Sequence, residues 1–388
     1  MSHNTTPIRL GMVGGGQGAF IGAVHRMAAR LDGHYQLVAG ALSSDPTRAH
    51  ASAMEIGLDP ARSYTSYQAM AEQEAARPDG IEAVAIVTPN HLHYPAAKAF
   101  LEAGIHVICD KPLTSTLADA EALVELVAQS GKLFVLTHNY SGYPMIRHAQ
   151  SMVANGELGA IQLVQVEYPQ DWLAKPIEQE GQKQAEWRTD PARTGVGGCV
   201  GDIGTHAWHL ASFVSGLETA SLAADLDTFV EGRRVDDNVH VLLRFKAVNG
   251  EHPAKGLLWA SQVAAGHENG LKLRVYGTKG SIEWVQADPN YLWHAPLGDA
   301  RRLITRGGVA ANAAAARVTR IPGGHPEGYL EGFATLYTEA ALAIKALRNG
   351  QPIPVEVSFP TVQDGLLGMR FIDACVRSSR ANAGWVNL

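Results

Sequence analysis

The stretch from Ala83 to Pro112 constrains the fold of this chain more than any other, because it holds two short apolar runs separated by a helical pattern. The runs are Ala83 to Val87 and His106 to Cys109, and both are rich in Val and Ile. Strand, helix and strand in this order are typical of a parallel α/β sheet. Ligands of such sheets lie beyond the carboxyl ends of the strands, so the residues that follow both runs are expected to border one crevice.

Polar residues follow both runs, namely Thr88, Pro89, Asn90 and His91 after the first, and Asp110, Lys111 and Pro112 after the second. Lys111 is the candidate catalytic group among them. Proline fixes its own φ and restricts the residue before it, so Pro112 helps to aim the lysine side chain. The alternative is a lysine that is only a solvated surface charge.

A glycine-rich turn follows the first predicted strand, Ile8 to Val13. The next nine residues read GGGQGAFIG, and a helical pattern comes after them. This order is the context of a dinucleotide-binding fingerprint, in which glycines allow the close approach of the diphosphate and the helix N-terminus supplies free N–H groups. Gly14 and Gly16 fit the start of the fingerprint, and Ala19 or Gly22 serves as its third small residue. The alternative is a plain tight turn.

The end of the second predicted strand, Gln36 to Leu42, bears on the choice between NAD and NADP. Ser43, Ser44 and Asp45 follow it, and Arg48 lies one helical turn further on. An acid at this strand end typically binds the adenosine ribose of NAD, and serine stands there instead. The serines and Arg48 leave room for a 2′-phosphate, whereas Asp45 can reach a ribose hydroxyl and repels a phosphate. We therefore lean slightly towards NAD. The alternative role of Asp45 is to cap the following helix.

A chain of 388 residues exceeds what one core usually serves, so two domains are expected. Residues 1–138 are predicted to form an α/β dinucleotide-binding domain of the Rossmann type. Residues 139–388 are predicted to form an α+β domain for substrate binding and oligomerisation. Alternation in Asn238 to Phe245 and Leu271 to Tyr276 indicates half-buried strands of a large, mostly antiparallel sheet, and Asn249-Gly250 predicts a turn. An uncovered sheet face favours a homodimer or homotetramer.

A helix is predicted from Asp202 to Gly216, and it carries Asp202 and His206 on one face because they are four residues apart. The structural alternative is a capping aspartate and a buried, hydrogen-bonded histidine. Together with Cys199 and His209, these residues also resemble a set of metal ligands. We expect no metal, because no second group of ligands completes the coordination sphere and His206 and His209 point about 60° apart.

Two long segments lack a clear period. Pro169 to Gly198 is predicted to be a functional loop, and it contains Trp172 and Arg188. Arg306 to Thr319 is rich in Gly and Ala and is either a mobile flap or, as we favour, a long connection.

Composition argues against several classes of protein. The formal net charge is −6 and no Lys/Arg cluster is interleaved with aromatic residues, so no nucleic-acid partner is expected. Three cysteines are too few for a disulfide framework and suit a reducing compartment. The sequence has neither a signal-peptide core nor an apolar run long enough to cross a membrane, so a cytoplasmic protein with no membrane partner is expected.

Five motifs together resemble the Gfo/Idh/MocA family. They are the glycine-rich loop, Thr88-Pro89-Asn90 with His93, Asp110-Lys111-Pro112, His138-Asn139-Tyr140 and Gly201-Asp202-Ile203-Gly204-Thr205-His206. The likeness spans nearly the whole chain. The usual family motif is Glu-Lys-Pro, and here Asp110 replaces the glutamate and leaves the lysine in place. The resemblance implies an NAD(P)-dependent dehydrogenase that oxidises a secondary alcohol of a sugar, inositol or glycoside. Two alternatives are an NAD-dependent glycoside-cleaving enzyme that uses transient oxidation, and a non-catalytic dinucleotide-binding sensor.

The predicted site has three groups of residues. Catalysis is assigned to Lys111, His206 and Asp202, with His206 as the base and Lys111 on the reacting oxygen, or with these two roles exchanged. The residues predicted to bind the cofactor are Gly14, Gly16, Gln17, Ala19, Phe20, Ser43, Ser44, Arg48, Thr88, Pro89, Asn90, His93, Asp110 and Lys111. The residues predicted to bind the substrate are Lys111, Asn139, Tyr140, Trp172, Arg188, Asp202 and His206.

Overall fold

The computed structural model describes residues 6–248 and 252–388. The chain forms two compact units, residues 1–139 with 329–366 and residues 140–328 with 367–388. The predicted division at residue 138 differs from this grouping, because it assigned residues 329–366 to the second domain. The physical reason is helix α11 (Tyr329–Arg348), whose buried face packs on helix α1 (Phe20–Leu31) of the first unit.

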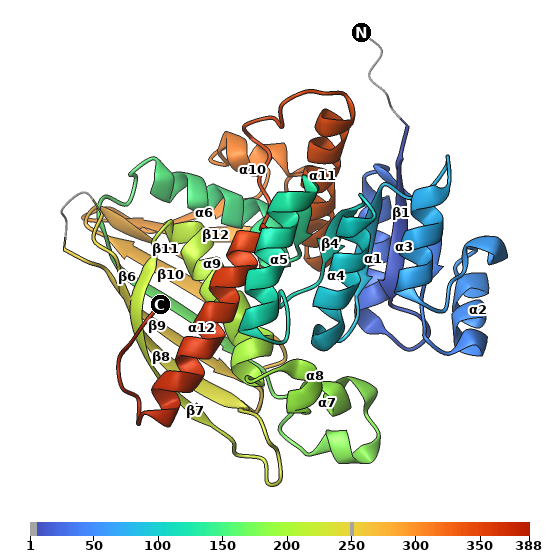
Figure 1. The fold of residues 1–388 in the computed structure, drawn as a ribbon. Coiled ribbons are helices and arrows are strands. Elements are labelled where there is room, and N and C mark those ends of the chain that lie inside the picture. Colours follow the sequence, from blue (N-terminus) through green and yellow to red (C-terminus); the bar gives the residue numbers. More distant parts are fainter. Residues whose placement is uncertain (1–5, 249–251) are drawn as a thin grey trace. The chain divides into compact units, whose positions relative to one another are not determined.

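The first unit is built on a parallel sheet of five strands in the order β2-β1-β3-β4-β5 (Figure 1). The strands are β1 (Ile8–Gly14), β2 (Tyr35–Ala41), β3 (Ala83–Val87), β4 (His106–Cys109) and β5 (Phe134–Leu136). The connecting helices are α1, α2 (Pro46–Glu55), α3 (Tyr67–Ala76), α4 (His93–Glu102) and α5 (Leu117–Ser130). β3 is buried along its whole length, as expected for a strand covered on both faces. The predicted Rossmann-type sheet is confirmed.

Helix α11 is fixed to α1 by buried aromatic and polar contacts. His25 donates or accepts a 2.8 Å hydrogen bond between its Nδ1 and the hydroxyl of Tyr337, and its ring also lies edge-on to Phe333. The hydroxyl of Tyr35 on β2 donates to the carbonyl oxygen of Tyr337 at 2.9 Å. These contacts join residues about 300 positions apart, so α11 completes the core of the first unit.

The second unit holds a nine-stranded sheet in the order β13-β12-β11-β10-β6-β9-β8-β7-β14. Its strands are β6 (Ile161–Pro169), β7 (Thr219–Asp227), β8 (Asn238–Phe245), β9 (Lys255–Ser261), β10 (Lys272–Gly277), β11 (Gly280–Val285), β12 (Tyr291–Pro296), β13 (Arg302–Thr305) and β14 (Val386–Asn387). β6 and β9 run parallel and the other neighbouring pairs named here run antiparallel. The predicted mostly antiparallel sheet is confirmed, and β12 to β14 were missed. The turn predicted at Asn249-Gly250 lies outside the described residues.

Helices of the second unit pack on one face of this sheet (Figure 1). They are α6 (Pro144–Ala154), α9 (Thr205–Ser215) and the part of α12 (Val362–Arg380) from Leu367 onward. The other face carries alternate residues of the strands, among them the exposed side chains of Leu163, Leu242 and Leu257. In a single copy of the chain, the apolar side chains on this face are exposed to solvent.

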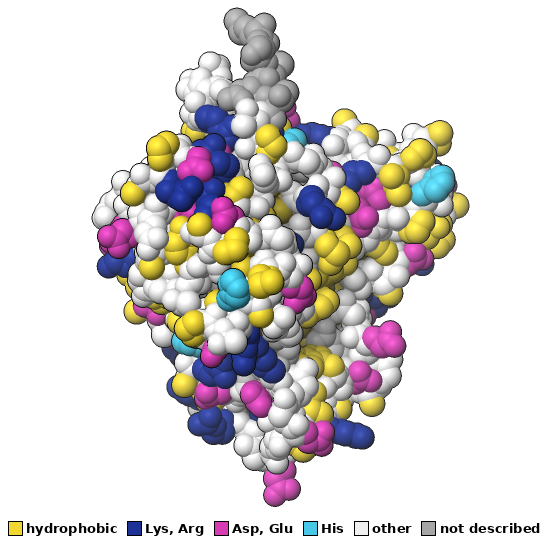
Figure 2. Space-filling model, turned by 90° about the vertical axis from the view of Figure 1, so that its right-hand side faces the viewer, with side chains coloured by type: hydrophobic (Ala, Val, Ile, Leu, Met, Phe, Trp, Pro, Cys, Tyr) yellow, Lys and Arg dark blue, Asp and Glu magenta, His cyan; other side chains and the backbone are white. Residues whose placement is uncertain are grey.

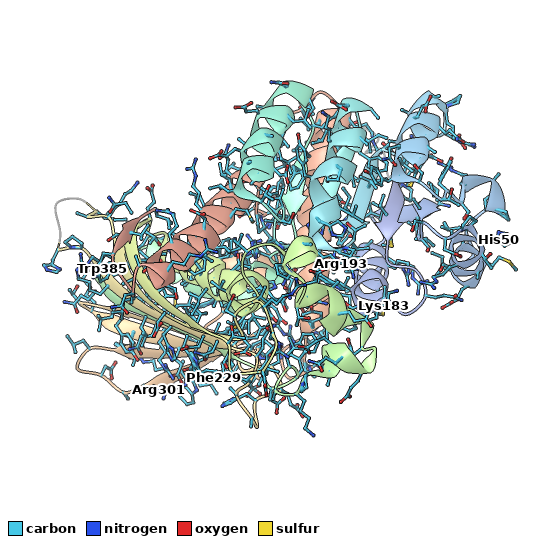
Figure 3. The ribbon with its side chains drawn as sticks, turned by 60° about the horizontal axis from the view of Figure 1, so that its bottom comes forward. His50, Lys183, Arg193, Phe229, Arg301 and Trp385 are labelled. Atoms are coloured by element: carbon cyan, nitrogen blue, oxygen red, sulfur yellow. The ribbon has the colours of Figure 1, made fainter. Side chains whose placement is uncertain are left out.

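The two segments without a clear period are more regular than predicted. The segment from Pro169 to Gly198 contains α7 (Lys183–Arg188) and α8 (Pro191–Thr194), which Lys183 and Arg193 mark in Figure 3. The segment from Arg306 to Thr319 contains α10 (Ala313–Arg317), and the backbone N–H of Asn312 donates to His148 Nδ1 at 3.1 Å. This anchor to α6 favours a long connection over a flap.

The described residues include no helix that is both long and apolar enough to cross a membrane. On the face drawn in Figure 2, Lys and Arg side chains are interspersed with Asp and Glu side chains.

The burial of His25 generates a prediction for stability. Burial lowers its pKa to about 4, although Asp110 acts in the opposite direction. The folded state therefore favours the neutral ring. The free energy of unfolding is not reduced by this group above pH 6.5, where the ring is neutral in both states. It falls as the pH drops from 6.5 to about 4, because only the unfolded state then binds the proton. The pKa difference corresponds to on the order of 3 kcal/mol. We expect urea titrations between pH 7.5 and 4 to show the wild type losing stability relative to His25→Gln.

The control for this prediction is His50→Gln, which changes an exposed histidine on α2 (Figure 3). Its stability relative to the wild type is expected to stay constant over the same range. A constant difference between the wild type and His25→Gln would contradict the prediction.

Candidate active site

The glycine-rich loop of the first unit is shaped by a close approach between two glycines. Gly14, Gly15 and Gly18 have φ values of +80°, +72° and +77°, a region that favours glycine. A Cβ on Gly22 of α1 would lie 2.3 Å from the Cα of Gly15, so only glycine allows the helix to pack on the loop. This close packing favours Gly22 over Ala19 as the third small residue of the fingerprint.

The start of α1 offers N–H groups to an anion. Ala19 is its N-cap and has no side chain that can cap the helix, and no acidic residue stands in the first turn. Phe20 is exposed beside it. A helix N-terminus without a side-chain cap, next to a loop with a close backbone approach, fits the diphosphate of a dinucleotide.

Three residues that the sequence analysis missed surround this loop, namely Arg26, Ser52 and Glu55. The predicted residue Gln17 donates from its backbone N–H to Ser52 Oγ and from Nε2 to Glu55 Oε2, both at 3.0 Å. Arg26 Nη1 donates to the carbonyl oxygen of Gly15 at 2.7 Å. With the loop, these residues line a hollow of about 420 Å³. Sequence alone gives no signal for Ser52 and Glu55, because they contact the loop across more than 30 residues of chain.

The residues after β2 hold the start of α2. Asp45 Oδ1 accepts from the backbone N–H of Arg48 at 2.7 Å, and Ser43 Oγ accepts from the backbone N–H of Asp45 at 3.2 Å. Ser44, Asp45 and Arg48 are exposed. Asp45 is thus a helix cap, which is the alternative that the sequence left open.

His93 joins the loops that follow β3 and β4. Its Nε2 lies 2.9 Å from the carbonyl oxygen of Thr88, and its Nδ1 lies 2.8 Å from that of Pro112. The ring is buried, and burial lowers its pKa while Asp110 opposes this effect. Both ring nitrogens face the backbone, so the structure gives His93 no free nitrogen for a cofactor. It acts instead as a brace behind the loop that carries Lys111.

Asp110 fixes the same loop from the other side. Its Oδ1 accepts from the backbone N–H of Lys111 at 2.9 Å and from Thr137 Oγ1 at 3.1 Å. Two buried polar atoms after β3 and β5, Thr88 Oγ1 and Asn139 Nδ2, have no hydrogen-bond partner among the described residues. Buried polar atoms are normally paired, so these two fit contacts to a bound cofactor or substrate. Pro89 and Asn90 complete the polar end of β3.

In the second unit, Asp202 and His206 lie where a π-helix runs into α9. The π-helix spans Val200–Gly204, and the N–H of Thr205 bonds to the carbonyl oxygen of Val200. The wider turn was not predicted, and it changes the expected relation of the two side chains along an α-helix. The glycines at positions 201 and 204 were the available signal. Gln262 Nε2 donates to Asp202 Oδ2 at 2.9 Å.

Aromatic side chains surround His206 in the same unit. The ring of Tyr140 stands edge-on to the imidazole with centroids 5.0 Å apart, and the ring of Tyr168 lies 6.3 Å away. The hydroxyls of Tyr140 and Tyr168 are hydrogen-bonded at 2.5 Å. Burial raises the pKa of Tyr140, so its hydroxyl stays protonated at neutral pH. The imidazole is therefore held in a nearly buried pocket with two phenol groups beside it.

Arg188, at the end of α7, connects two tryptophans to Asp202. Its guanidinium carbon lies 4.2 Å from the centre of the Trp187 ring and 5.9 Å from that of Trp172. Its Nε lies 3.5 Å from Asp202 Oδ2. The structure thus brings together, within the second unit, Trp172, Arg188, Asp202, Tyr140 and His206 of the predicted substrate-binding residues.

Asp236, in the loop before β8, fixes the turn that leads into the π-helix. Its two carboxylate oxygens accept from the backbone N–H groups of Gly198 and Val200 at 2.6 and 2.7 Å. Burial raises the pKa of Asp236 to about 6, and both hydrogen bonds oppose this rise. Sequence analysis missed this residue, since its partners are 36 and 38 positions away.

The metal alternative receives no support from the geometry. Within the two described ranges, no three His, Cys, Asp or Glu side chains are grouped so that they could hold a metal ion. Cys199 is buried, and burial raises its pKa well above the ordinary value, which disfavours the thiolate that binds metals.

A parallel sheet with this loop, joined in one chain to a polar and aromatic pocket on a second sheet, defines a two-domain, dinucleotide-binding oxidoreductase. Residues 8–138 match the oxidoreductase family with an NAD-binding Rossmann fold, and residues 146–283 match the GFO/IDH/MocA C-terminal domain. The chain belongs to the Gfo/Idh/MocA family of oxidoreductases, as its motifs indicated.

Solved and curated relatives agree with this assignment. The chain is 61% identical to an oxidoreductase from Sinorhizobium meliloti, with a TM-score of 0.90 and coverage of 98% and 99% of the two chains. It is 36% identical to an inositol dehydrogenase homolog from Azotobacter vinelandii solved with NADH and myo-inositol, with a TM-score of 0.92 and coverage of 99% and 98%. It is 30% identical to levoglucosan dehydrogenase of Pseudarthrobacter phenanthrenivorans over 71% of this chain and 73% of that one.

The contact between Gly15 and Gly22 generates a prediction for cofactor binding. In Gly22→Ala the new methyl group would meet backbone atoms, so the loop must move away from α1. We expect the Kd for NADH, measured by calorimetry, to rise at least about tenfold, or 1.4 kcal/mol. Gly328→Ala is the control, because a Cβ there meets no atom within 4 Å. Unchanged affinity in a folded Gly22→Ala protein would contradict the role given to this contact.

Proposed function

We propose that this protein is an NAD-dependent dehydrogenase that oxidises a secondary alcohol of a neutral sugar, inositol or glycoside. The observation that carries the proposal is the group formed by Asp202, His206, Tyr140 and Arg188, which offers hydroxyl-binding donors and acceptors next to aromatic surface. A polyol needs this mixture, because each buried hydroxyl left unpaired costs roughly 1 to 3 kcal/mol. The inositol dehydrogenase homolog with bound myo-inositol and levoglucosan dehydrogenase support a neutral substrate.

The first unit would hold NAD through the glycine-rich loop and the start of α1, with the residues after β2 at the ribose and those after β3 and β4 towards the nicotinamide. When bound, the nicotinamide ring supplies the acceptor for the hydride of the carbinol carbon. Asp45, which already caps α2, carries the negative charge that disfavours a 2′-phosphate, and this supports NAD over NADP.

Removal of hydride from a carbinol carbon leaves a protonated carbonyl unless a base accepts the hydroxyl proton. We assign this role to His206, whose imidazole Tyr140 and Tyr168 hold in place. Asp202 would bind a neighbouring hydroxyl or orient the base. Lys111 would donate to the reacting oxygen and stabilise its developing negative charge, and the roles of Lys111 and His206 can be exchanged.

The assembly and location follow from two further observations. The uncovered face of the nine-stranded sheet, with Leu163, Leu242 and Leu257, supports a homodimer or homotetramer formed through this face. The three cysteines are buried and free, which suits a reducing compartment and supports the cytoplasm.

The proposal is tested with a panel of inositols, pyranoses, glycosides and their phosphates, each assayed with NAD and NADP. We expect a neutral polyol to give the highest kcat/KM, with NAD preferred, because Asp45 repels a 2′-phosphate. Selectivity for a phosphorylated or non-carbohydrate substrate would overturn the substrate class. A hundredfold preference for NADP would overturn the role given to Asp45. Products from glycosidic cleavage, or no turnover at all, would favour the two alternative functions.

The assignment of catalytic groups predicts that Lys111→Ala and His206→Ala each lower kcat by on the order of 10² to 10⁴. The Kd for NADH should change far less than kcat in both variants, because the glycine-rich loop that would hold the diphosphate is left intact. Stopped-flow measurement of NADH formation tests the first point and calorimetry the second. Turnover close to that of the wild type in either variant would remove that residue from the mechanism.

A further inference from the structure

The guanidinium of Arg188 is held in one position by its neighbours on α7. Its Nη1 donates to Gln184 Oε1 at 2.6 Å, and Trp187 Nε1 donates to the same oxygen at 3.2 Å. The Trp187 ring lies under the guanidinium as well. A cation fixed by a planar ring and a shared acceptor loses little entropy when it binds a ligand, so Arg188 is preorganised.

The same guanidinium is paired with the candidate catalytic aspartate. Arg188 Nε lies 3.5 Å from Asp202 Oδ2, and the two side chains are 21% and 15% exposed. Gln262 Nε2 donates to that carboxylate oxygen from the other side. Arg188 Nη2 makes no hydrogen bond to any residue that the structure describes. The pair therefore places an N–H donor of Arg188 next to the carboxylate of Asp202 at a partly exposed position.

A hydroxyl group matches this pair because it can donate and accept at the same time. A carboxylate or phosphate only accepts and is repelled by Asp202, and an ammonium group only donates and is repelled by Arg188. We propose that Arg188 is a specificity-determining residue that, together with Asp202, binds a hydroxyl next to the reacting carbon and so restricts the enzyme to neutral vicinal polyols. This inference rests on the proposed function and names the substrate feature that the site selects.

The energetic consequence is selectivity against analogues that lack the hydroxyl. A site built to hydrogen-bond a hydroxyl leaves its own buried groups unpaired when the analogue binds. Hydrogen bonds to charged groups correspond to roughly a 10- to 100-fold change in kcat/KM each. Removal of Arg188 should abolish this discrimination and should have little effect on a substrate that already lacks the hydroxyl.

The experiment measures kcat/KM for myo-inositol and D-glucose and for their monodeoxy analogues, with D-glucuronate as the anionic probe. The variants are Arg188→Met and Arg188→Lys, and the control is Lys183→Met, which changes an exposed residue at the start of α7 (Figure 3). We expect Arg188→Met to lower kcat/KM for the intact polyol by about 30- to 100-fold, and that for one monodeoxy analogue by less than about threefold. Arg188→Lys, which keeps the charge but loses the planar fork, should fall between.

The outcomes separate this inference from the proposed function. No turnover of any polyol by the wild type would overturn both. An active wild type whose discrimination against each monodeoxy analogue persists in Arg188→Met would overturn the inference alone. So would an equal loss for all substrates, or better turnover of D-glucuronate than of D-glucose by the wild type. Thermal midpoints and the Kd for NADH establish that each variant is folded, and Arg188→Lys supplies the comparison if Arg188→Met is not.

Discussion

The buried carboxylate of Asp236 is the interaction on which the second unit's candidate site depends. It accepts the N–H groups of Gly198 and Val200, so it sets the path of the backbone immediately before Asp202 and His206. Its pKa of about 6 means that burial disfavours the charged form, which at neutral pH costs about 3 kcal/mol relative to an exposed aspartate. The pH dependence of stability is opposite to that from His25. The free energy of unfolding falls as the pH rises from 3.8 to 6, because Asp236 ionises more readily in the unfolded state. The carboxylate thus orders two backbone N–H groups at a cost in folding free energy.

Asp237, the residue after Asp236, holds the segment that carries Trp172. Asp237 accepts from Arg233 Nη1 at 3.2 Å, and the same Nη1 donates to the carbonyl oxygen of Leu173 at 2.9 Å. The other end of the guanidinium bonds to Glu178 at 3.1 Å. One loop before β8 therefore holds both the turn before the π-helix and the segment after β6. Asp236, Asp237 and Arg233 are buried and fix the backbone of the segments that carry Asp202 and Trp172. The side chains that would touch a substrate can therefore remain partly exposed.

Sequence patterns predicted what depends on local periodicity. The limits of β3 and β4 follow from short apolar runs, and Asp202 and His206 were found because they share a motif. Long-range contacts were not predictable. The packing of α11 on α1 joins His25 to Tyr337, and no pattern within either helix specifies that partner. The π-helix was missed because its only local signal, the glycines at positions 201 and 204, is also compatible with the start of an ordinary α-helix. Strands β12 to β14 are short, and β14 has only two residues.

His93 shows why a motif can name a residue correctly and still mislead about its role. Thr88-Pro89-Asn90-x-x-His93 suggested a group that touches the cofactor, but the ring lies between two carbonyl oxygens inside the first unit. A neutral imidazole donates only one hydrogen bond, so both carbonyl oxygens receive a donor only when the ring is protonated. Burial favours the neutral form, and Asp110 favours the charged one. Burial has the larger effect, so the pKa of His93 is lowered, and a mainly neutral ring supports the loop that carries Lys111, as the carboxylate of Asp236 supports the turn before Asp202. In each unit a buried titratable side chain that bonds to the backbone fixes the segment next to a residue proposed for chemistry, His93 in the first unit and Asp236 in the second.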